Sequence, residues 1–187
     1  LGSGPVRSIV QKEDIFKELN YSDNSDKTTI ILEVDKLPPL EIVEKVSNDS
    51  GINSKKISFI LTPTTSLCGN IQVVSRVLEV AIHKVHELKF PLSRIIHGAA
   101  FSPLPPIAKD FLTGMGRTND SIIYGGVVQL LIDGDEDDLI ALAKELPSSS
   151  SRDYGKPFKE IFKDNNNDFY KIDGSLFSPA KVIVNSK

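Results

Sequence analysis

Apolar and polar residues follow one another along the first half of the chain in segments that favour helices and strands in turn. The pattern predicts helices over residues 6–20 and 40–51, the second beginning after two prolines, and strands over residues 28–34, 57–61 and 94–101. Polar turns and prolines separate these segments. Such alternation is typical of a mixed or parallel sheet with helices packed on it.

Residues 71–88 form an amphipathic pattern that predicts one further helix. Its polar side carries Arg76, Glu79, His83 and His86, and its apolar side carries Val74, Leu78, Ala81, Val85 and Leu88. An Arg and a Glu three residues apart on a helix can be a solvated ion pair of little energetic consequence. They can equally be a catalytic pair. The helix by itself leaves both interpretations open.

The second half of the chain is less regular. Prolines and glycines predict an irregular segment over residues 103–120, followed by a strand over 121–132 whose central Gly125 and Gly126 indicate a bulge or a close approach of another backbone. The acidic run DGDEDD favours a helix start, and a short helix and two strands are expected at 158–164, 168–173 and 180–185. We therefore expect an α+β fold, a layered mixed α/β arrangement in which residues 1–187 form a single compact domain.

Composition narrows the possible functions. The chain has 187 residues, 40% of them hydrophobic, a net charge of −3 and no clustering of its basic residues, which argues against nucleic-acid and membrane partners. No apolar run reaches the roughly 20 residues of a membrane span, and no signal-peptide pattern opens the chain. The single cysteine, Cys68, excludes an intrachain disulfide and is expected to be a small buried residue. These features favour a cytoplasmic protein.

Two groups of residues invite a chemical interpretation. His83 and His86 are three residues apart and could chelate a metal, but their order, H-K-V-H-E, lacks the third ligand of an H-E-x-x-H site, so we expect no metal. The segment GMGRTND combines glycines with four different polar side chains, which suits a loop that grips a polar heterocycle or an anion. A simple turn capped by Asn and Asp is the alternative.

Three long segments carry a resemblance to a known family: TSLCGNIQVVSRVLEVAIHKVHEL, MGRTNDSIIYGG and PSSSSRDYGKPFKEIFKDNNNDFYKIDGSLFSPAKVIV. Together they resemble methenyltetrahydromethanopterin cyclohydrolase, a pterin-dependent enzyme of one-carbon metabolism, including methanogenesis. The resemblance runs from Leu1 to the C-terminus and covers the C-terminal three-fifths of a two-domain enzyme. Its GSGP segment resembles one that the family carries internally, which argues against a cloning scar.

The resemblance implies a reaction and the residues that perform it. The reaction is hydrolysis of the cyclic methenyl group to a formyl group, with no metal or dissociable cofactor. The matching SRVLE motif places catalysis on Glu79 and Arg76 and, less directly, a pocket carboxylate on Glu33. The GMGRTND segment and the polar loop SSSSRDYG are expected to border the same cleft and to bind the substrate through Arg117, Thr118, Asn119, Asp120, Ser151 and Arg152.

The resemblance also implies partners. A tetrahydromethanopterin derivative is the expected substrate, and the protein is expected to form a homotrimer. The family's N-terminal part normally forms the other wall of the pocket, so a companion chain supplying it is a possible partner. Two alternatives are a non-catalytic pterin-binding or assembly module, and a metal hydrolase that uses His83 and His86.

Overall fold

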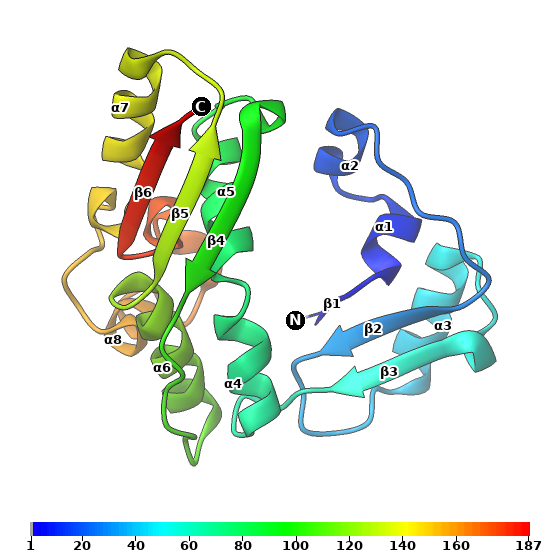
Figure 1. The fold of residues 1–187 in the computed structure, drawn as a ribbon. Coiled ribbons are helices and arrows are strands. Elements are labelled where there is room, and N and C mark those ends of the chain that lie inside the picture. The colour runs from blue at the N-terminus through cyan, green and yellow to red at the C-terminus, as the bar shows by residue number, and fades with distance from the viewer. Residues whose placement is uncertain (1) are drawn as a thin grey trace. The chain divides into compact units, whose positions relative to one another are not determined.

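The chain divides into two compact units. The computed structural model describes residues 2–187, with unit 1 ending at Pro63 and unit 2 running from Thr64 to Lys187. From the sequence we expected a single compact domain. The structure instead gives each unit its own three-stranded sheet and its own cluster of buried apolar side chains (Figure 1). The α+β class, with helices layered on mixed sheets, is confirmed.

Unit 1 is built on a sheet with strand order β1-β2-β3. Strand β1 pairs with β2 in antiparallel fashion, whereas β2 and β3 are parallel, with Thr28 opposite Ile57 and Leu32 opposite Leu61. The strands predicted at 28–34 and 57–61 and the helix predicted at 40–51 are thus confirmed. Its elements are β1 (Gly2–Ser3), α1 (Val6–Val10), α2 (Asp14–Glu18), β2 (Thr28–Leu32), α3 (Leu40–Ser50), the 3-10 turn η1 (Ser54–Lys56) and β3 (Ile57–Leu61).

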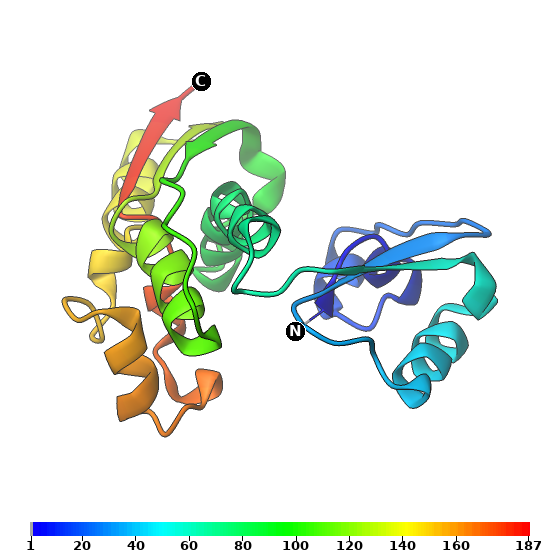
Figure 2. The same ribbon diagram turned by 90° about the horizontal axis from the view of Figure 1, so that it is seen from below.

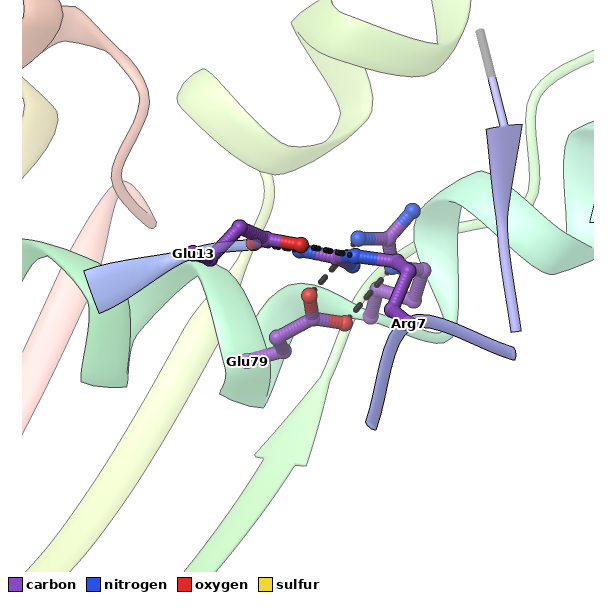
Figure 3. A network of polar contacts seen from close by, with 4 residues as sticks. Arg7, Glu13 and Glu79 are labelled. Carbon is purple, nitrogen blue, oxygen red and sulfur yellow. Dashed lines mark hydrogen bonds and ion pairs between the residues drawn. The ribbon is translucent and has the colours of Figure 1, made fainter. Parts of the chain in front are cut away.

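The single helix predicted over residues 6–20 is wrong, because the chain breaks between α1 and α2. Gln11 adopts a left-handed conformation with φ 53°, which ends α1. Across this break Arg7 Nε donates to Glu13 Oε1 at 2.8 Å, and Arg7 Nη2 contacts Glu13 Oε2, so the two side chains form an ion pair (Figure 3). The buried side chain of Val6 packs into the core with Ile30 and Leu32.

Unit 2 has a sheet of order β4-β5-β6 (Figure 1). Strands β4 and β5 are antiparallel and β5 and β6 are parallel. None of the helices within residues 2–187 is long and apolar enough to cross a membrane. The regular elements are α4 (Leu67–Val74), α5 (Val77–Glu87), β4 (Ile95–Phe101), α6 (Phe111–Ile123), β5 (Val127–Ile132), α7 (Glu136–Glu145), α8 (Phe158–Asp164) and β6 (Lys181–Ser186). Short 3-10 turns are η2 (Leu92–Arg94), η3 (Ser148–Ser150), η4 (Phe169–Lys171) and η5 (Gly174–Leu176).

One buried apolar cluster of unit 2 lies between its sheet and the helices α5 and α7, and a second joins α6 to α8. Alternate residues of β5, namely Val128, Leu130 and Ile132, are fully buried, and they share a cluster with Ala81 and Val85 of α5. Figure 2 shows α5 and α7 along one face of the sheet. The buried half of α5 therefore fixes the orientation of its polar side.

The helix predicted over residues 71–88 is two helices. Helix α4 ends at Val74 with Ser75 as its C-cap, and Arg76, with φ −86° and ψ 11°, precedes α5. The Arg76 N–H donates to Val73 O at 3.2 Å, closing a tight turn between the helices. The division into an apolar and a polar side is nevertheless correct, because Ala81 and Val85 are buried while His83 is exposed.

The segment predicted to be an irregular loop, GMGRTND, lies inside helix α6. Asp110 starts this helix by accepting a hydrogen bond from Thr113 N at 2.8 Å. The glycines serve close packing: a Cβ at Gly114 would lie 2.8 Å from Thr64 O, and one at Gly116 would lie 3.0 Å from Lys159 Cβ. A sequence that favours a turn locally is therefore helical because of what packs on it.

Two strand predictions need correction and one is confirmed. The strand expected over 121–132 begins only at Val127, since residues up to Ile123 are helical. Gly126 does mark a close approach, because a Cβ there would lie 2.6 Å from Ile122 O. The segment 168–173 is not a strand but contains η4, started by Asp168, which accepts from Tyr170 N at 3.0 Å. Strand β6 confirms the strand predicted at 180–185.

Candidate functional site

Arg76 and Glu79 form an ion pair with two hydrogen bonds at the start of α5. Arg76 Nε lies 2.6 Å from Glu79 Oε2, and Arg76 Nη2 lies 2.7 Å from Glu79 Oε1. Figure 3 shows the Glu79 carboxylate standing out from its helix. The two side chains are 40% and 55% exposed, so the pair is accessible to water and to a ligand.

The position of this pair is set by the fold of unit 2. Glu79 lies in the first turn of α5, where the helix dipole favours a negative charge. On the opposite side of the helix Val77, Ala81 and Val85 are buried in the core, which fixes the rotation of the helix. A guanidinium that bonds both carboxylate oxygens also fixes the plane of the carboxylate. Such a carboxylate can accept a proton from water or balance a cationic ligand.

The two histidines of α5 lie farther along the same helix. His83 is exposed and His86 is partly buried. Within residues 2–187, no group of three or more His, Cys, Asp and Glu side chains is arranged to hold a metal ion. Cys68 is exposed, contrary to the expectation that it is buried, because it lies on the outer side of α4, away from the buried Gly69 and Asn70.

The four polar side chains of the GMGRTND segment make hydrogen bonds within unit 2. The Arg117 guanidinium donates to Pro106 O and Ile107 O at 3.2 Å each, and it holds the segment before α6. Thr118 is buried and donates to carbonyls one turn earlier in the helix, and Asn119 Nδ2 does the same to Met115 O at 2.9 Å. These contacts support the fold. Direct binding of substrate by these residues stays a prediction.

Asp120 and Tyr124 connect the end of α6 to the segment after the serine-rich loop. Asp120 Oδ1 accepts from Phe158 N at 2.8 Å, and Tyr124 Oη donates to Lys156 O at 2.6 Å. Burial raises the pKa of Asp120, and the hydrogen bond from Phe158 only partly offsets that rise. The end of the GMGRTND segment and the end of the SSSSRDYG segment are thus brought together, although whether they border one cleft stays a prediction.

Ser151 and Arg152 are anchored by an aspartate that sequence analysis did not identify. Asp173 Oδ2 accepts from Ser151 Oγ at 2.8 Å and from Arg152 N at 3.2 Å. Asp173 N in turn donates to Asp153 Oδ2 at 2.9 Å, which closes the network. Burial raises the pKa of Asp173, but hydrogen bonds from Ser151, Ser175 N and Arg152 N outweigh it and leave this pKa below its usual value.

Lys84 is a second residue that sequence analysis missed. It is buried, and its ammonium donates to Ser175 O at 3.1 Å and to Ser150 Oγ at 3.3 Å. A signal was present in the sequence, because Lys84 lies three residues after Ala81 and so falls on the apolar side of α5. A lysine on the buried side of a helix indicates a specific polar partner within the fold.

Glu33 lies in unit 1, and each unit has a hollow on its surface. Glu33 follows β2 in unit 1 and is partly buried. Unit 1 has a hollow of about 550 Å³ whose lining includes Lys27, Lys55 and Lys56. In unit 2 a hollow of about 310 Å³ lies beside Leu88, at the opposite end of α5 from Glu79. A cleft at Arg76 and Glu79 stays a prediction.

Comparison with known proteins identifies close relatives of the chain. A family model described as cyclohydrolase (MCH) matches residues 1–187. A protein of Methylobacillus flagellatus named methenyltetrahydromethanopterin cyclohydrolase is 56% identical over 98% of this chain and 56% of its own length. Proteins of the same name from Methylosinus trichosporium and Methylobacterium organophilum are 55% and 52% identical, over 98% and 100% of this chain and 71% and 57% of their own lengths. The chain thus spans little more than half the length of two of these three relatives.

Proposed function

Because the chain belongs to the cyclohydrolase (MCH) family, we propose that it takes part in the hydrolysis of methenyltetrahydromethanopterin to formyltetrahydromethanopterin. The relatives carry this substrate in their names. In the proposed reaction the oxygen of water bonds to the methenyl carbon, one carbon–nitrogen bond of the ring breaks, and one proton is released. The protein then acts in one-carbon metabolism, and a cytoplasmic location goes with this proposal.

The observation that carries the proposal is the ion pair of Arg76 and Glu79, which is held by two hydrogen bonds. Glu79 supplies a carboxylate that takes the proton from the attacking water and balances the positive charge of the methenyl group. Arg76 holds that carboxylate in one plane through bonds of 2.6 Å and 2.7 Å. Their partial exposure supports the proposal, since the substrate carbon and a water molecule must both reach the carboxylate.

The other predicted residues take secondary roles in the proposal. Ser151 and Arg152 bind the pterin carrier from the turn that Asp173 anchors. Asp120 acts beside them at the end of α6, with Arg117, Thr118 and Asn119 shaping that helix, and Glu33 contributes a further pocket carboxylate. We propose no metal and no dissociable cofactor, and we propose that the portion of the relatives outside this chain completes the pocket.

The decisive experiment measures the loss of methenyl absorbance when the substrate is added to the protein. It is run on the chain alone and on the chain joined to the remaining portion of the Methylobacillus relative, with binding of the pterin titrated in parallel. Hydrolysis well above the spontaneous rate supports the proposal. A joined protein that neither binds nor hydrolyses the substrate rejects it. Binding without hydrolysis would favour a non-catalytic pterin-binding module.

A homotrimer is part of the proposal. The face of the unit 2 sheet that turns away from α5 carries large exposed apolar side chains, and exposed apolar patches on soluble proteins are typical of contact surfaces. Phe101 of β4 is 64% exposed and Ile183 of β6 is 38% exposed. Sedimentation equilibrium measures the assembly directly: a mass three times that of the chain supports the trimer, and a monomer at micromolar concentration contradicts it.

A further inference from the structure

Lys84 is an ammonium group held in the interior of unit 2. Its side chain is 3% exposed, and its helix neighbours Ala81 and Val85 are completely buried. Burial lowers the pKa of Lys84, whereas the nearby carboxylates of Asp173, Glu145 and Glu87 raise it. A buried cation costs stability unless hydrogen bonds and opposite charges surround it, and an apolar side chain of similar volume often stabilises such a position better. Packing alone therefore does not account for a lysine here.

The contacts of Lys84 lead to two turns that are distant in sequence. Its Nζ donates to Ser150 Oγ at 3.3 Å in η3 and to Ser175 O at 3.1 Å in η5. Both turns are short, and neither has the repeated backbone hydrogen bonds of a long helix. The ammonium on helix α5 thus joins two turns that other contacts also anchor: Ser148 Oγ of η3 donates to Ile123 O at 2.6 Å, and Leu176 of η5 is completely buried.

From η5 the connection continues to the turn that carries Ser151 and Arg152. Ser175 N donates to Asp173 Oδ1 at 3.1 Å, which fixes the orientation of the carboxylate. The second oxygen, Asp173 Oδ2, holds Ser151 Oγ at 2.8 Å and Arg152 N at 3.2 Å. Hydrogen bonds to an ionised carboxylate are stronger than those between neutral groups, so this turn is set by the position of Asp173.

We propose that Lys84 is a positioning residue for substrate binding: it fixes η3 and η5 against α5 so that Asp173 presents Ser151 and Arg152 to the pterin carrier. This inference rests on the proposed function for its substrate. The same helix carries Glu79 on its outer side and Lys84 on its inner side, so one rigid element relates the reacting carboxylate to the binding turn. Lys84 does not touch the reacting atoms in this scheme.

The test compares Lys84→Met with Lys144→Met, a matched change at an exposed lysine of α7. Amide hydrogen exchange measures how rigidly residues 151–153 are held, independently of activity. Titration measures the dissociation constant for the pterin. In the joined protein the steady-state assay separates KM from kcat. For Lys84→Met we expect faster exchange in the turn, a dissociation constant and a KM raised by about tenfold, and a kcat changed by less than about twofold.

Two further variants keep the test sharp. Lys84→Gln retains N–H donors without the charge and should recover part of the binding. Asp173→Asn weakens the hydrogen bonds that hold Ser151 and Arg152. It replaces Lys84→Met in the test if that variant does not fold. Unchanged exchange, or faster exchange with unchanged pterin binding, in both Lys84→Met and Asp173→Asn would overturn the inference alone. A wild-type protein that binds no pterin would overturn the proposed function as well.

Discussion

Arg76 and Glu79 face each other across one turn of chain with two parallel hydrogen bonds, 2.6 Å and 2.7 Å long. This geometry separates the pair from an ordinary surface ion pair, in which a single flexible contact contributes little. A guanidinium bonded to both oxygens leaves the carboxylate with one orientation, and the buried side of α5 fixes where that orientation points. The pair therefore supplies a preorganised negative charge.

Glu79→Gln removes that charge and the proton acceptor while keeping the size of the side chain. We expect the rate of methenyl hydrolysis to fall by about 10²–10⁴-fold, because a carboxamide cannot take a proton from water. Pterin binding should persist. The matched control is Glu136→Gln, since Glu136 is an exposed glutamate in the first turn of α7. Near-normal turnover in Glu79→Gln, with substrate still bound, would show that the pair is a solvated surface ion pair without a catalytic role.

Arg76→Lys keeps the positive charge but loses the planar fork. A lysine ammonium makes one point contact where the guanidinium makes two, so the carboxylate gains rotational freedom. We expect hydrolysis to slow by about 10-fold or more, with thermal stability nearly unchanged. Steady-state kinetics measures the change in hydrolysis rate, and a thermal melting curve measures the change in stability. Equal rates in the variant and the wild type would show that orientation by Arg76 is dispensable.

The local pattern of the sequence was sufficient to predict the positions of helices and strands whose apolar residues repeat without interruption. Strands β2, β3 and β6 and helices α3, α7 and α8 lie where that pattern predicted them. Helix α6 was missed because its glycines and the prolines before it favour a loop locally. Its interior glycines are required by backbone contacts with Thr64 and Lys159, which only the folded chain brings near. Asp110, three residues before Thr113, was the available signal for its start.

In the candidate site, too, local spacing predicted some residues and missed others. The three-residue spacing of Arg76 and Glu79 predicted their contact, and the structure confirms that contact. Asp173 could not be found by spacing, because it is joined to Lys84 and Ser151 only by the packing of turns far apart in sequence. A side chain that acts across such a distance leaves no local pattern. A lysine on the apolar side of a predicted helix is the one sign that such a partner exists.

Gly114→Ala tests the close packing of α6. An alanine at this position would gain up to about 1 kcal/mol in helix propensity. Its Cβ, however, would lie 2.8 Å from the backbone oxygen of Thr64, which cannot yield as a flexible side chain would. We expect a net loss of about 1–2 kcal/mol in the free energy of unfolding, measured by urea titration. Gly174→Ala is the control, because nothing lies within 4 Å of the added Cβ there. A stabilised Gly114→Ala variant would contradict the packing described.

Asp173→Asn tests the carboxylate that anchors the serine turn, through the dependence of stability on pH. The pKa of Asp173 lies below its ordinary value: burial raises it, and the hydrogen bonds from Ser151, Ser175 N and Arg152 N lower it by more. The folded state therefore binds the proton of this group more weakly than the unfolded state does. Its stabilising contribution is complete above the ordinary aspartate pKa of about 3.9 and disappears as the pH falls through the lower, folded value.

For this reason the cost of Asp173→Asn should be greatest near neutral pH. Loss of charged hydrogen bonds predicts a decrease of about 1–3 kcal/mol in the free energy of unfolding at about pH 7, and this decrease should shrink as the pH falls below the ordinary aspartate pKa of about 3.9. Urea titrations of wild type and variant across this range measure the difference. Asp137→Asn, at an exposed position of α7, should change the free energy by less than about 0.5 kcal/mol. A difference between wild type and Asp173→Asn that did not shrink as the pH fell below the ordinary aspartate pKa of about 3.9 would mean that the ionised form of Asp173 does not hold the turn.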